Sequence, residues 1–118
     1  MSITFWSDQD SEITTTYDCL CDGAVPSCYE CKGTGKVHFT GKAHAVNLSN
    51  SNAWRLLPVM GLVQDYGGTV DQCDMPAVVL RLQQARRTCR VDDDGRVQAL
   101  LTLFRAAVAG GWQQIHWG

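Results

Sequence analysis

Four cysteines close together near the start of the chain constrain its fold more than any other feature. Cys19, Cys21, Cys28 and Cys31 lie in the stretch Cys-Leu-Cys-Asp-Gly-Ala-Val-Pro-Ser-Cys-Tyr-Glu-Cys-Lys-Gly-Thr-Gly-Lys. The second pair has the CxxC spacing of a zinc knuckle, and the first pair is CxC. Two close thiolate pairs joined by a turn can converge on one tetrahedral zinc ion. The stretch therefore predicts a structural zinc site with these four cysteines as its ligands.

Other uses of the same cysteines stay open at this point. They could be reduced and unliganded, or they could form a redox pair, although the glycine-rich context lacks the strand-to-helix setting of a thioredoxin motif. His38 or His44 could replace a cysteine of the CxC pair as a ligand. A catalytic zinc is disfavoured, because four thiolates leave no open position for water.

Size and charge indicate one small domain. A chain of 118 residues with 45% hydrophobic residues can build one modest core. We expect a single domain over residues 1–118, with the zinc knuckle at residues 18–36 inserted between N-terminal strands. Ten basic and twelve acidic side chains give a net charge of −2, without a run of Lys and Arg. This balance disfavours nucleic-acid binding as the main function.

The composition also predicts a cytoplasmic protein without a membrane segment. Residues 1–10 include Asp8 and Asp10 and lack a basic region followed by an apolar one, so we expect no signal peptide. No stretch approaches 18 uninterrupted apolar residues. In a reducing compartment, clustered cysteines are metal ligands more often than disulfides.

Alternation of apolar and polar residues predicts strands at both ends of the chain. We expect strands at residues 3–6 and 12–17, and one bent strand or two short ones at residues 36–48 as a hairpin arm that leads back into the sheet. A closing strand is expected at residues 112–117, with Ile115 and Trp117 facing one way. Residues 66–68, Tyr-Gly-Gly, predict a turn.

Three helices are expected between these strands. The first is capped by Asn50 or Ser51 and ends at Gly61, the second begins at Asp74, and the third begins after residues 92–94 and stops at residues 110–111. Their predicted inner faces are Ala53, Leu56, Leu57 and Met60; Met75, Val78, Val79, Leu82, Ala85 and Cys89; and Val97, Leu100, Leu101, Phe104, Ala107 and Val108. The fold class is α+β: a small mixed sheet of N-terminal and C-terminal strands, packed with about three helices, plus the cysteine-rich zinc knuckle.

Two resemblances follow from these motifs. Residues 28–35, Cys-Tyr-Glu-Cys-Lys-Gly-Thr-Gly, resemble one CxxCxGxG unit of the zinc-binding region of DnaJ-type chaperones. The match covers eight residues, and the chain has a CxC pair where a second unit would be, so it implies zinc binding and not chaperone activity. The layout from the knuckle to the terminal His-Trp-Gly is similar to small, uncharacterised zinc-knuckle proteins of bacteria and their phages. That likeness implies an architecture and no reaction.

We find no catalytic constellation, so the sequence predicts a non-enzymatic module that binds another protein. In view of the second resemblance, one form of this hypothesis is a phage-encoded modulator of a host system, such as an anti-CRISPR protein, acting in the host cytoplasm. Trp54, beside a run of Asn and Ser, is a candidate anchor for the protein partner. The alternatives are a nucleic-acid accessory protein that contacts phosphates through Lys32, Lys36 and Lys42, and a thiol redox protein.

Overall fold

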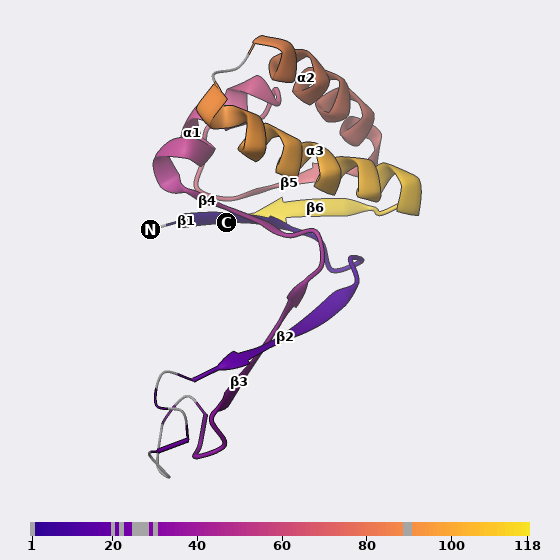
Figure 1. Ribbon diagram of the computed structural model, residues 1–118. Coiled ribbons are helices and arrows are strands. Elements are labelled where there is room, and N and C mark those ends of the chain that lie inside the picture. Colours follow the sequence, from indigo (N-terminus) through magenta and orange to yellow (C-terminus); the bar gives the residue numbers. More distant parts are fainter. Residues whose placement is uncertain (1, 20, 22, 25–28, 30, 89–90) are drawn as a thin grey trace. The chain divides into compact units, whose positions relative to one another are not determined.

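The chain forms two compact units. The computed structural model describes residues 2–19, 21, 23, 24, 29, 31–88 and 91–118 (Figure 1). The larger unit, here called the body, comprises Met1–Ser11 and His44–Gly118, and the smaller one, the arm, is Glu12–Ala43. A single domain over residues 1–118 stays a prediction, because compactness alone does not say whether the units unfold together.

The body contains an antiparallel four-stranded sheet. Its strands are β1 (Ser2–Trp6), β4 (Val46–Ser49), β5 (Gly68–Asp71) and β6 (Gln114–Trp117), in the order β4-β1-β6-β5. Phe5 is opposite Trp117, and Thr4 and Gly118 exchange backbone N–H···O bonds of 3.0 and 3.1 Å. The N-terminal and C-terminal strands thus share one sheet, which confirms the predicted α+β class.

One face of this sheet is covered by the three helices (Figure 1). Alternate residues of the strands face the helices and are buried: Ile3, Phe5, Val46, Leu48, Val70, Ile115 and Trp117. The intervening residues are more exposed, and two of them, Trp6 and His116, have ring centroids 4.9 Å apart. The predicted alternation of residues 114–117 is confirmed.

Helix α1 (Asn50–Val59) has well-defined ends. Its N-cap is Ser49, whose hydroxyl accepts a 3.3 Å bond from the Asn52 backbone N–H, so the prediction of Asn50 or Ser51 was wrong by one or two residues. At the other end Gly61 has a φ of +75°, and the Leu62 N–H donates to Leu57 O at 2.9 Å. This is the predicted glycine-terminated stop, in its Schellman form.

Pro58 lies inside α1 without leaving a backbone carbonyl unsatisfied. A proline lacks the N–H that would bond to the carbonyl four residues earlier, here that of Trp54. Gln64 Nε2 donates to Trp54 O at 2.8 Å and takes the place of the missing donor. The residues after the helix therefore stabilise its last turn.

The 3₁₀ turn η1 (Gln72–Asp74) leads into α2 (Met75–Thr88), and α3 (Val91–Gly110) follows. Met75, Val78 and Leu82 of α2 are buried as predicted; Cys89 lies outside the described residues. Helix α3 begins at Val91 and not after residue 94. On α3, Val108 is 47% exposed, contrary to prediction, while Leu103 is fully buried.

The arm is a two-stranded antiparallel hairpin of β2 (Glu12–Asp18) and β3 (Lys36–Lys42). Polar residues face one another across it: Lys36 pairs with Asp18, Lys42 with Glu12 at 3.4 Å, and Thr16 Oγ1 lies 2.8 Å from His38 Nδ1. The expected hairpin is present, but β2 and β3 form a two-stranded sheet separate from that of the body and pair with each other along their whole length.

Candidate metal centre

Three thiols lie together in the arm, between β2 and β3. Cys21 Sγ is 3.6 Å from Cys19 Sγ and 3.3 Å from Cys31 Sγ, and all three sulfurs lie within 4.8 Å of one another. In a tetrahedral zinc–thiolate site the sulfurs are about 3.8 Å apart, given Zn–S bonds of about 2.3 Å. These three cysteines, here called the thiol cluster, can hold a metal ion.

The backbone around Cys31 is shaped by residues with positive φ. Lys32, Gly33 and Gly35 have φ angles of +53°, +85° and +77°. Glycine adopts such angles without the steric penalty of a Cβ atom, which accounts for the two glycines that follow the CxxC pair. The chain therefore turns back sharply just after Cys31.

Hydrogen bonds hold this turn against the end of β2. The Cys19 N–H donates to Gly35 O at 2.8 Å, and the Thr34 hydroxyl donates to Cys31 O at 2.7 Å. Gly23, with a φ of +76°, lies against the same segment: a Cβ atom added there would be 3.5 Å from Gly35 N. The two cysteine-bearing segments are thus in backbone contact, and this contact brings Cys19 and Cys21 to Cys31.

Three of the four predicted ligands are in the thiol cluster, and Cys28 lies outside the described residues. Both cysteines of the CxC pair take part, which removes the reason to expect a histidine in their place. His44 Nδ1 is 2.8 Å from Asp10 Oδ1, in the body, and His38 is bonded to Thr16. Cys73 lies outside the cluster and is exposed in η1.

Cys19 and Cys31 are buried in the arm. Each is 4% exposed, and among the arm side chains whose burial is described no other is buried; Ile13, for example, is 48% exposed. An isolated two-stranded hairpin is at best marginally stable in water. The described part of the arm thus has a thiol cluster where a larger unit would have an apolar core.

The body holds a separate polar cluster where the chain leaves for the arm and returns. The Asp10 carboxylate accepts hydrogen bonds from the backbone N–H groups of Ser11 (2.8 Å) and His44 (2.7 Å) and lies beside the His44 ring. Burial of this carboxyl favours its neutral form, but the bonds from His44 outweigh that effect and lower the pKa of Asp10.

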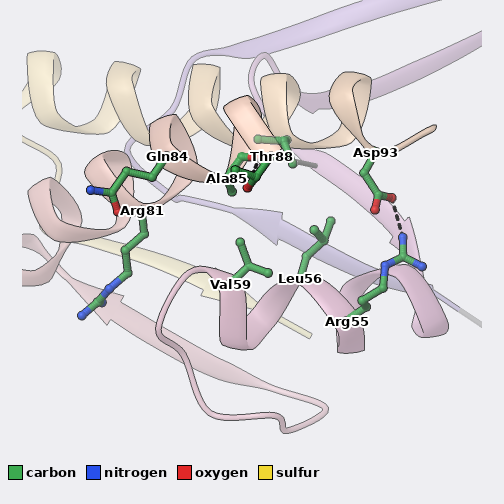
Figure 2. A pocket seen from close by; sticks show the side chains of 9 residues that line it. Arg55, Leu56, Val59, Arg81, Gln84, Ala85, Thr88 and Asp93 are labelled. Carbon is green, nitrogen blue, oxygen red and sulfur yellow. Dashed lines mark hydrogen bonds and ion pairs between the residues drawn. The ribbon is translucent and has the colours of Figure 1, made fainter. Parts of the chain in front are cut away.

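A groove of about 540 Å³ lies between α1 and α2. Figure 2 shows Leu56 and Val59 of α1 across from Ala85 and Thr88 of α2, with the Arg55–Asp93 ion pair at one end. Asp93 is 7% exposed and also pairs with Arg96 at 3.1 Å, so its carboxylate is held in place at this end of the groove. The α1–α2 groove has a mostly apolar floor and charged ends.

A second hollow, lined by Trp54 and Tyr66, adjoins the same helix. The two rings have centroids 5.3 Å apart, and their residues are 37% and 66% exposed. Arg55 lines both hollows. Trp112 and Trp117, by contrast, are buried. The Trp54 side chain is therefore accessible to a partner, as its predicted role as an anchor requires.

No protein family, curated protein or solved structure matches the chain. Among the described residues, no helix has both the length and the apolar character needed to cross a membrane.

Proposed function

We propose that the protein is a non-enzymatic binding module whose arm is stabilised by zinc. The observation that carries this proposal is the thiol cluster. Cys28, outside the described residues, is proposed as the fourth ligand. Four thiolates are soft ligands that suit Zn²⁺ in tetrahedral geometry. The glycine turn after Cys31 supports the likeness to a DnaJ-type zinc unit, with the thiols of the CxC segment in place of a second unit.

The role proposed for the metal is structural. A zinc ion with four thiolate ligands has no open position at which water or a substrate could be activated. The arm needs such a clip, because its described side chains provide no other buried cluster. Metal binding then supplies the free energy that keeps the turn closed.

Elemental analysis of the purified protein tests this role. We expect about one zinc ion per chain, lost in Cys21→Ser because a hydroxyl is a poor ligand for zinc. Cys73→Ser is the matched control, since Cys73 is exposed and outside the cluster, and it should retain its metal. A wild-type preparation free of zinc, made without chelators, would contradict the proposal, and iron in place of zinc would correct the metal.

The ligand of the module is proposed to be another protein, bound at the outer side of α1. Trp and Tyr are enriched among the residues that contribute most to protein interfaces, and Trp54 and Tyr66 form an exposed pair beside the apolar α1–α2 groove. A host protein bound by a phage-encoded modulator is one setting for such an interaction.

Affinity purification with matched variants tests this part. We expect a partner in stoichiometric amounts with the wild type and its loss with Trp54→Ala, since truncating a hot-spot residue costs about 2 kcal/mol or more. Leu80→Ala removes another exposed apolar side chain, 55% exposed on α2, and should leave the complex intact. Capture that is equal for all three proteins would contradict binding through α1.

A thiol redox protein is the second candidate, favoured by the 3.3 Å distance between Cys21 Sγ and Cys31 Sγ. In that reaction the two thiols would give two protons and two electrons to a disulfide of the substrate and become a disulfide themselves. A redox function requires a metal-free protein in which the disulfide between Cys21 and Cys31 forms reversibly. The same elemental analysis therefore separates the redox protein from the zinc-stabilised module.

A further inference from the structure

A groove on the other side of α2 is lined by three arginines. It has a volume of about 520 Å³ and lies between α2 and α3, where Arg86, Arg87 and Arg105 surround it together with Gln83 and Leu101. Leu101 is buried at 1% exposure, and the other side chains that line the groove are three arginines and a glutamine. We call it the arginine groove.

Two of the three arginines of this groove lack an ion pair within the described part of the chain. Within the described part of the chain, Arg87 and Arg105 have no ion pair, and Arg86 pairs with Asp94 at 3.4 Å between half-exposed side chains. Exposed pairs of this kind contribute little to stability. Helix α2 contains no acidic residue, and neither does α3 after Asp94. In a protein of net charge −2, this is a segregated positive surface.

The dipole of α2 partly offsets the positive charge of the groove, but its effect is smaller. Arg86 and Arg87 lie in the last turn of α2, where the helix dipole contributes roughly half a negative charge. The positive charges of Arg87 and Arg105 outweigh it. Guanidinium also offers paired N–H donors that match the oxygens of phosphate, which a lysine does not.

We propose that the arginine groove binds a ligand with consecutive phosphate groups. The polar groups of the lining are guanidinium and amide groups on several side chains, and donors spread in this way suit a chain of phosphates better than a single carboxylate. The source of the phosphates is either a small polyphosphorylated molecule or the backbone of a single-stranded nucleic acid. This site is independent of the zinc proposed for the arm.

Calorimetric titration of the full chain at low salt tests the proposal, with tripolyphosphate and a single-stranded oligothymidylate as probes. We expect both to bind, and Arg87→Gln with Arg105→Gln to weaken binding at least about ten-fold, the loss of charged hydrogen bonds. Arg81→Gln is the control: Arg81 is also an exposed α2 arginine but lines the α1–α2 groove, so its loss should leave affinity unchanged. Tripolyphosphate can also remove metal ions from a protein, and a heat signal from that reaction would be the same in the double variant as in the wild type.

The two probes also separate the two sources. Tighter binding of the oligonucleotide identifies a nucleic-acid backbone if the logarithm of its affinity also falls linearly with the logarithm of the salt concentration. Tighter binding of tripolyphosphate identifies a small ligand. Either result supports the arginine groove as the binding site only if the double variant Arg87→Gln, Arg105→Gln binds that probe more weakly. Equal binding by the double variant, no binding of either probe, or equal affinity for an oligoglutamate peptide would overturn it.

Discussion

Gly68 and Trp117 show how single residues fix the packing of the body. A Cβ atom at Gly68 would lie 2.3 Å from Cζ2 of the Trp117 ring, which is 7% exposed in the core. The opposite holds at Gly95, in α3, where an added Cβ meets nothing within 4 Å. One glycine is therefore required by its neighbour, and the other is only a weak helix former.

Alanine at these two positions should change stability in opposite directions. We expect Gly68→Ala to lower the free energy of unfolding by about 1–3 kcal/mol through overpacking. Gly95→Ala should raise it by up to about 1 kcal/mol, because alanine favours the helix. Urea unfolding followed by tryptophan fluorescence measures both. Similar effects of the two substitutions would contradict the close Gly68–Trp117 contact.

The Asp10 carboxylate should make stability depend on pH in the acid range. Its pKa in the folded state is lowered by His44, so its contribution is present above the pKa of the unfolded chain, about 3.9, and is lost as the pH falls through the folded value. Asp10→Asn should cost about 2 kcal/mol at pH 7, where charged hydrogen bonds are lost. The difference in the free energy of unfolding between this variant and the wild type should become smaller below about pH 4. Unfolding curves from pH 7 to pH 3 test this, and a difference independent of pH would contradict it.

At the scale of elements, α1 illustrates what local sequence determines. Its end could be predicted, because a glycine with positive φ is a strong stop signal. Its beginning was less certain, because several consecutive residues, Ser49, Asn50, Ser51 and Asn52, can all cap a helix. The strand pairing of Ser49 with Ser2 decides between them, since it places Ser49 at the junction of β4 and α1.

Substitution of the two serines should separate the cap from its neighbour. Ser49→Ala should destabilise the protein by about 1 kcal/mol, as expected for the loss of an N-cap. Ser51→Ala should change stability by less than about 0.5 kcal/mol, as for an ordinary exposed position. Thermal unfolding by circular dichroism measures both, and the reverse order of effects would restore Ser51 as the cap.

For the whole molecule, the limits of sequence reasoning follow from the range of the interactions. The cysteines could be identified because metal ligands in a knuckle are close in sequence. Strand β5 was missed: it has four residues, only one of them buried, and exists because β6, more distant along the chain, pairs with it. The separation of the arm from the main sheet was missed for the same reason, since β2 could not be distinguished from a strand of the body.

Removal of the metal should affect the arm before the body. The body has its own apolar core, while Cys19 and Cys31 are the only buried residues among the arm side chains whose burial is described. After treatment with a high-affinity zinc chelator, we expect amides of β2 and β3 to exchange hydrogen at nearly unprotected rates, and those of α3 to stay protected. Hydrogen-exchange mass spectrometry tests this. Unchanged protection in the arm would show that zinc does not hold it together.

The central place of β1 in the sheet bears on the order in which the protein folds during synthesis. Its partner β6 is made more than a hundred residues later, so one edge of β1 stays unpaired until synthesis is nearly finished. The cysteines, by contrast, leave the exit tunnel early and together. The thiol cluster of the arm can therefore assemble while most of the body is still being translated, and β6 then inserts between β1 and β5 as a late step.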